Sequence, residues 1–129
     1  MEWIYRATLL IAGLINLLPA LLAFFPERIP GSYGIDVPDA NYELLLRHRA
    51  VFFGIIGGLM IYSSVVKRYT KMATAVGLIS MTSFIILYVS IGKGINPELR
   101  MVMMIDVVAT IILCIGLASF KLKLKKPDQ

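Results

Sequence analysis

Four ionisable side chains lie inside long apolar stretches of this 129-residue sequence: Arg47, His48, Arg49 and Asp106. Charged groups are rare in such stretches because removing them from water is costly, so each one is a candidate functional residue. Guanidinium groups suit carboxylates and phosphates, and an imidazole exchanges protons near neutral pH. These residue types predict a binding site for an anionic or carbonyl-bearing group, in which Asp106 orients an arginine or carries a proton.

The apolar stretches are long enough to be membrane-spanning helices. A helix rises about 1.5 Å per residue, so about twenty residues cross a hydrocarbon core of roughly 30 Å, and only a helix satisfies its own backbone over that length in lipid. The predicted spans cover residues 7–26, 44–66, 72–92 and 101–120. We therefore expect an all-α fold, a four-helix transmembrane bundle, with residues 1–129 forming a single transmembrane domain.

The composition supports a membrane location and excludes several kinds of site. Hydrophobic residues make up 58% of the chain and charged residues 16%, with a net charge of +5. Basic residues gather at the ends of the apolar stretches, near anionic lipid headgroups, so membrane lipids rather than nucleic acid are the expected partners. One cysteine, Cys114, and one histidine exclude an intramolecular disulfide and a Cys-based or His-rich metal site, and no cofactor is predicted.

Charges between the spans predict the orientation of the bundle. Basic side chains fill the connection at residues 67–71 and the tail at residues 121–126, whereas the other connections carry more acidic residues. The positive-inside rule then places both termini in the cytoplasm of a multi-pass protein of the cell (inner) membrane. A secretory signal peptide is the competing interpretation of the first span, but no clear cleavage site follows it and three further spans do.

The connections also carry turn and helix-start signals. The first is rich in proline and glycine, which favours an ordered, turn-rich cap. Asp39 or Asn41 is expected to be the N-cap of the second helix. Pro97 suits the first turn of the fourth helix after a short connection, so the third and fourth helices are expected to be antiparallel neighbours.

The arginines and Asp106 are expected at matching depth in the outer half of the bundle. Asp106 lies five residues inside its span, roughly 8 Å from the outer boundary, and residues 47–49 lie near the same boundary. An ion pair of Asp106 with an arginine is expected, and Arg49 is favoured because Glu43 offers Arg47 a partner one turn away. The two arginines point about 200° apart, so one should face inward and the other outward.

Small and polar residues mark the expected interior. Asn16, Ser80 and Ser83 are expected to line the lower part of the ligand site, and Tyr33 is expected to close it from the first connection. Rows of small residues let helices approach closely. The glycine-rich segment Gly54–Gly58 of the second helix fits such packing and also fits the interface of a homodimer.

Structural roles compete with functional ones for each charged residue. An arginine near a helix N-terminus reaches headgroups cheaply, His48 suits a packing role, and Asp106 suits a counter-ion or a hydrogen bond between helices. The leading functional hypothesis is a non-enzymatic protein that binds a lipid-like or other small amphiphile. The alternatives are a proton-coupled small-molecule exporter that uses Asp106, and an intramembrane enzyme that uses His48 and Asp106. No catalytic nucleophile motif is present.

Three segments carry a resemblance to a known family. They are LLLRHRAVFFGIIGG at residues 44–58, GLISMTSF at residues 77–84 and NPELRMVMMIDVV at residues 96–108. The sequence resembles a family of small four-helix bacterial integral membrane proteins of uncharacterised function, over nearly the whole chain.

The family pattern implies the same candidate site. It includes an Arg-His-Arg triplet entering the second helix and an acidic residue within the fourth, which Arg47, His48, Arg49 and Asp106 match. Some members of the family are labelled phosphopantetheine adenylyltransferase. That soluble enzyme needs a nucleotide-binding α/β fold and a paired-histidine motif, and this chain has one histidine, so the label does not apply.

Overall fold

The computed structural model describes residues 2–124, and every regular element within them is a helix. Four helical segments are long and apolar enough to cross a membrane, as predicted. They are α1 (Glu2–Leu17) continued by the 3-10 helix η1 (Leu18–Ala23), α3 (Ala40–Val66), α4 (Thr70–Ile91) and α5 (Pro97–Leu124). Two short helices, η2 (Pro26–Arg28) and α2 (Ile29–Tyr33), join the first segment to α3. Lys125 and Lys126 of the basic tail lie outside the described residues.

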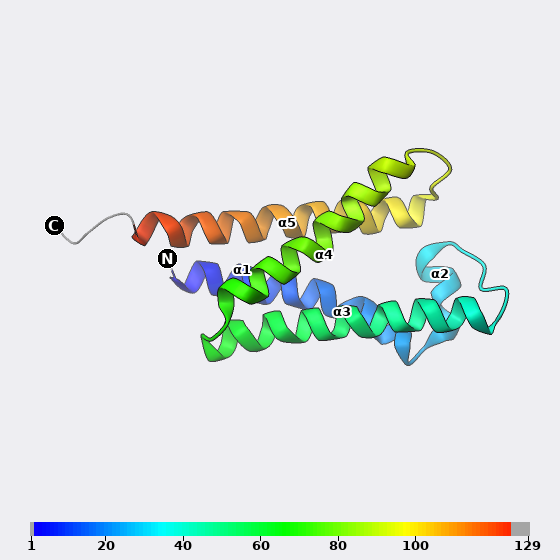
Figure 1. Cartoon of the computed structure of the whole chain (residues 1–129), viewed down its shortest axis with the longest axis horizontal. Coiled ribbons are helices and arrows are strands. Elements are labelled where there is room, and N and C mark those ends of the chain that lie inside the picture. The colour runs from blue at the N-terminus through cyan, green and yellow to red at the C-terminus, as the bar shows by residue number, and fades with distance from the viewer. Residues whose placement is uncertain (1, 125–129) are drawn as a thin grey trace.

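The long helices alternate in direction along the chain (Figure 1). The start of α1, the end of α5 and the α3–α4 turn lie at one end of the bundle, here called the turn end. The helix α2 and the α4–α5 connection lie at the opposite end, here called the cap end. The helix α1 packs mainly against α3 and α5, and α4 crosses obliquely and packs against α5 and α3. The predicted antiparallel contact of the third and fourth spanning helices is confirmed.

Proline and glycine shape the connection at the cap end. Pro19 has no backbone N–H, so it removes an α-helical hydrogen bond, and the chain continues from Leu18 as the 3-10 helix η1. The helix α2 then ends at Gly34, whose φ of 60° is a left-handed conformation that suits glycine. The first connection is therefore an ordered, turn-rich cap, as predicted.

Side chains cap α3 at both of its ends. Asp39 is the N-cap, because its carboxylate accepts hydrogen bonds from the backbone N–H groups of Asn41 at 2.7 Å and Tyr42 at 3.1 Å. At the other end, Arg6 of α1 donates from Nε to the carbonyl oxygen of Ser64 at 2.6 Å. A cation at the carbonyl end of a helix also complements the helix dipole. Arg6 therefore fixes the turn end of α1 to that of α3.

An asparagine ties the cap end together. Asn96, just before α5, donates from Nδ2 to the carbonyl oxygens of Tyr33 at 2.8 Å and Gly34 at 2.9 Å. Its Oδ1 accepts from the backbone N–H of Leu99 at 2.8 Å. One amide thus joins the end of α2 to the first turn of α5.

The buried core is divided between two clusters, and the outer surface is apolar. One cluster joins the long helices and includes Leu9, Met60, Met81 and Leu113, each at most 1% exposed. The second lies at the cap end, around Ile29 of α2. Large apolar side chains also cover the outside of every long helix, with Ile55, Ile79, Val89 and Ile115 all more than half exposed. Such a surface is typical of contact with lipid.

The backbones of α1 and α3 approach each other closely at Gly13 and Gly57. A Cβ atom built on Gly57 would lie 2.7 Å from the carbonyl oxygen of Gly13 and 2.8 Å from the backbone nitrogen of Leu17. Gly54 faces Ala20 of η1, whereas Gly58 faces open space. Within the predicted glycine row, two residues therefore pack inside the chain and Gly58 is left on the surface. The homodimer itself stays a prediction.

We predict that Gly57→Ala destabilises the protein and that Gly58→Ala does not. The methyl group on residue 57 forces α1 and α3 apart, which costs about 1–3 kcal/mol, whereas a methyl group on residue 58 meets nothing within 4 Å. Thermal unfolding of both variants in the same detergent, followed by circular dichroism, makes the comparison. Equal Tm values for the two variants would contradict the close contact of α1 with α3.

Candidate functional site

A cavity of about 540 Å³ lies between α1 with η1, α2, α3 and α5, toward the cap end. Apolar side chains form most of its wall, including Ile15, Leu22, Phe53 and Val102. Six polar or charged residues complete it: Asn16, Arg28, Ser32, Tyr33, Arg49 and Asp106. A largely apolar cavity of this size with a few polar groups is typical of a site for a small organic molecule.

Arg49 points into the bundle from α3 and is surrounded by aromatic rings. Its guanidinium carbon lies 5.2 Å from the ring centre of Tyr33, 5.1 Å from that of Phe53 and 5.3 Å from that of Phe84. Each geometry allows a cation–π interaction, which stabilises a desolvated cation. Nη2 of Arg49 is buried and has no hydrogen-bond partner within residues 2–124. Because Arg49 lines the cavity, a bound molecule that reaches this nitrogen would supply its missing acceptor.

Asp106 of α5 is only 7% exposed and lines the same cavity. The predicted ion pair of Asp106 with Arg49 is not formed, because the guanidinium group lies among the three rings instead. Within residues 2–124 the carboxylate has neither an ion-pair nor a hydrogen-bond partner, and the ion pair found there joins Arg47 to Glu43. The cavity therefore contains a cation and a carboxylate that do not neutralise each other by direct contact.

Asn16 of α1 adds a further unpaired group to the cavity. It is 3% exposed, and its Nδ2 donates to the carbonyl oxygen of Ala12 at 3.0 Å. Its Oδ1 is buried with no hydrogen-bond partner. A buried polar atom without a partner is costly and calls for an explanation. A ligand that donates a hydrogen bond to this oxygen supplies one.

Tyr33 closes the cavity at the cap end, where the sequence predicts it. The residue is 6% exposed, and Asn96 holds its backbone in place. Burial raises the pKa of the Tyr33 phenol, while the charge of Arg49 lowers it and that of Asp106 raises it further. The phenol is therefore neutral at physiological pH.

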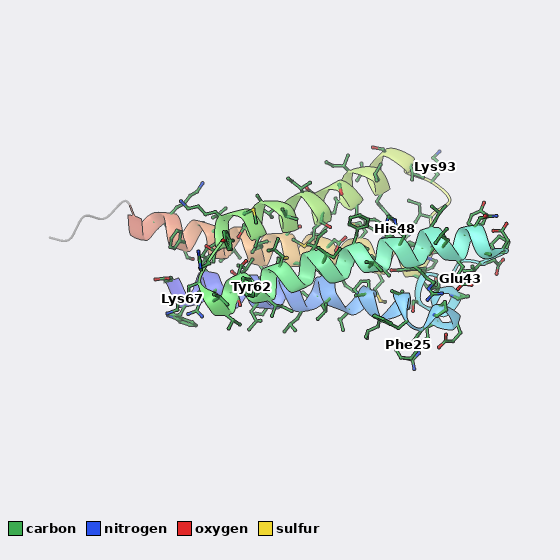
Figure 2. All side chains as sticks on the ribbon, turned by 60° about the horizontal axis from the view of Figure 1, so that its bottom comes forward. Phe25, Glu43, His48, Tyr62, Lys67 and Lys93 are labelled. Atoms are coloured by element: carbon green, nitrogen blue, oxygen red, sulfur yellow. The ribbon has the colours of Figure 1, made fainter. Side chains whose placement is uncertain are left out.

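Arg47 and His48 face a different surface of α3. The Nη1 atom of Arg47 lies 3.0 Å from the Glu43 carboxylate, and its Nε donates to the carbonyl oxygen of Ala23 at 2.9 Å. His48 is exposed and lies edge-on to the ring of Phe52, with the ring centres 4.8 Å apart. Both residues border a separate surface pocket near Glu43, and Figure 2 shows Glu43 and His48 on this part of α3.

The structure separates the predicted site residues into two groups. One arginine faces inward and the other outward, as predicted, and the inward one is Arg49. The structure brings Arg49, Asp106 and Asn16 to one cavity and leaves Arg47 and His48 outside it. An intramembrane enzyme that uses His48 and Asp106 requires both groups beside one substrate position, and the structure places them at separate pockets.

The expected serines lie on the far side of Arg49. Ser80 and Ser83 border a smaller cavity of about 240 Å³ between α3 and α4, to which Phe84 and Arg49 also contribute. The ring cage of Arg49 is the feature that the sequence interpretation missed. Phe53 follows Arg49 by one helical turn and was detectable from that spacing, whereas nothing in the sequence links Phe84 to Arg49.

No protein-family model, curated protein or solved structure matches this chain.

We predict that Arg49 and Phe84 are energetically coupled. A double-mutant cycle with Arg49→Met and Phe84→Leu should give a coupling of roughly 0.5–2 kcal/mol, the range of a desolvated cation–π contact. Phe120, which stacks on Tyr5 at the turn end, serves as the control ring, and Phe120→Leu should show no coupling to Arg49. Unfolding in detergent supplies the four free energies of each cycle. The cage would be refuted if both phenylalanines gave the same coupling.

Proposed function

We propose that this chain is an integral membrane protein that binds a lipid-like or other small amphiphile, whose anionic or carbonyl group is held by Arg49. The observation that carries the proposal is that Arg49 lines the 540 Å³ cavity and that its Nη2 is buried with no hydrogen-bond partner within residues 2–124. A donor on a charged group in an apolar site contributes strongly to binding when it meets an oxygen acceptor.

The membrane location rests on the four apolar spans and on where the charges lie. Lys67 lies near the turn end, and Glu43 lies toward the cap end (Figure 2). The basic residues at the turn end support a cytoplasmic location for this end and for both termini, by the positive-inside rule. The cap end then lies in the outer half of an inner membrane, and the cavity opens there.

We predict that the two ends of the bundle are labelled from opposite sides of the membrane. In a Cys114→Ser background, Gly31→Cys at the cap end should react with an impermeant maleimide on intact spheroplasts. Lys71→Cys at the turn end should react only after the membrane is opened. Both residues are exposed, so access to the reagent decides the result. Labelling of residue 71 in intact spheroplasts would contradict the proposed orientation.

The rim of the cavity suits an amphiphile that lies partly in the bilayer. Leu18, Leu21 and Ile105 are 67%, 55% and 45% exposed, and they form an apolar edge between η1 and α5. Arg28 and Ser32 are exposed at the part of the rim formed by η2 and α2. An amphiphile with its polar head beside Arg49 and an acyl or prenyl chain along the apolar edge would match both the polar and the apolar part of the rim.

We predict that Arg49→Gln abolishes selective binding of anionic amphiphiles. The probes are a long-chain fatty acid and an alkyl phosphate, with the matching fatty alcohol as the neutral comparison, titrated into protein in nanodiscs. Hydrogen bonds to charged groups contribute about 1.5–3 kcal/mol, so the affinity for the acids should fall about tenfold or more. Native mass spectrometry of gently extracted protein tests for a co-purifying ligand in parallel.

The matched control is Arg47→Gln, the same substitution two residues away on the same helix. Because Arg47 faces Glu43 outside the cavity, this variant should retain the binding of the wild type. Equal loss of binding in both variants would show that the effect comes from surface charge, and this result would contradict the proposal. Equal affinity of the wild-type protein for the fatty acid and the fatty alcohol would also contradict it.

The family resemblance fits this proposal. In the described fold, the Arg-His-Arg triplet and the acidic residue of the family pattern form one inward pair, Arg49 and Asp106, and two outward residues, Arg47 and His48. We propose that the inward pair carries the shared binding role in such small four-helix membrane proteins.

A further inference from the structure

We infer that the head group bound in this cavity is zwitterionic, with an anionic oxygen held by Arg49 and an ammonium group held by Asp106 and Asn16. The inference rests on the proposed function and narrows it, because it names both charges of the ligand. It excludes a simple fatty acid or a carbonyl compound as the preferred ligand.

The first argument is electrostatic. Arg49 and Asp106 line one cavity, and they form no ion pair although each would gain from a partner of opposite charge. Burying an isolated charge costs several kcal/mol unless it is paired and hydrogen-bonded. The rings of Tyr33, Phe53 and Phe84 stabilise the cation, whereas the carboxylate has no ion-pair or hydrogen-bond partner within residues 2–124. A molecule with one charge of each sign between the two groups pairs both.

Two residues that line the cavity carry polar atoms without a hydrogen-bond partner within residues 2–124. Nη2 of Arg49 is a donor without an acceptor, and Oδ1 of Asn16 is an acceptor without a donor. The Asp106 carboxylate, with no partner among residues 2–124, adds further acceptor sites. The α1 and α5 side of the cavity therefore has free hydrogen-bond acceptors but lacks hydrogen-bond donors. A primary ammonium group supplies three N–H donors, whereas a carboxylate or a quinone supplies none.

A purely anionic head group fits this site less well. It would satisfy Arg49 and leave the acceptors of Asn16 and Asp106 unpaired, with its own negative charge close to the carboxylate. A quaternary ammonium group would balance the charge but donates no hydrogen bond. Phosphoethanolamine has the required combination, since an anionic phosphate and a primary ammonium group are joined by two carbon atoms.

The test compares lysophospholipids with one acyl chain and different head groups, bound to the protein in nanodiscs and counted by native mass spectrometry. The probes carry phosphoethanolamine, N-acetylated phosphoethanolamine, phosphocholine and phosphoglycerol. Phosphoethanolamine should bind at least tenfold more tightly than the other three, since each of them lacks either the positive charge or the ammonium N–H donors. Free phosphoethanolamine without an acyl chain is the additional arm, and tight binding of it would assign the site to a soluble metabolite and overturn a lipid ligand.

Two substitutions test where the ammonium group of the ligand binds. Asp106→Asn should remove the preference for phosphoethanolamine and leave the affinity for phosphoglycerol unchanged or raised. Asn16→Leu should reduce the preference in the same direction. Asp36→Asn, which removes an acidic residue that is not part of the cavity lining, is the matched control and should retain the preference.

The outcomes separate this inference from the proposed function. If phosphoglycerol binds as tightly as phosphoethanolamine and Arg49→Gln weakens both, the zwitterion is wrong and binding through Arg49 stands. If no probe binds selectively and Arg49→Gln changes nothing, both fail. The comparison of probes on the wild type decides between these results even if Asp106→Asn does not fold.

Discussion

A guanidinium group held inside an apolar bundle is the constraint around which the cap end is organised. Burial of Arg49 is tolerable only if the charge is stabilised locally, and its three rings come from three elements: Tyr33 from α2, Phe53 from α3 and Phe84 from α4. The short helix α2 must therefore fold over the bundle, and α4 must pass close to α3 at this depth. Asn96 stabilises the folded-over position of α2 by donating hydrogen bonds to the backbone at the end of that helix.

Close packing elsewhere gives the cavity its room. The helices α1 and α3 touch through Gly13 and Gly57 near the middle of the bundle, and Arg6 fixes them together at the turn end. Toward the cap end η1 replaces the α-helix, α2 fills part of the space, and a cavity remains between them and α5. The polar groups of the site thus come from separate helices, so a ligand that contacts all of them also holds those helices together.

Periodicity and local chemistry allowed much of this to be predicted. The apolar runs gave the four helices, Asp39 was one of two predicted N-caps, and the angular separation of Arg47 and Arg49 showed that one would face inward. The predicted ion pair of Arg49 with Asp106 was wrong because equal depth in the bundle does not determine the lateral distance between two side chains. The rings that α2 and α4 contribute around Arg49 could not be predicted, because they depend on where these two helices pack. Adjacent residues diverge by about 100° around a helix, so the triplet could not act as a unit, and His48 lies apart from Asp106.

The 3-10 geometry of η1 has a kinetic consequence. Residues three apart stack directly above one another in such a helix, so Leu18 and Leu21 form a single edge beside the cavity. The hydrogen bonds of a 3-10 helix are also poorer than those of an α-helix, which makes this edge the softest part of the wall. For a ligand of the proposed kind, exchange with the bilayer is fastest along η1. The softness of this edge follows from Pro19, which interrupts α-helical hydrogen bonding at the start of η1.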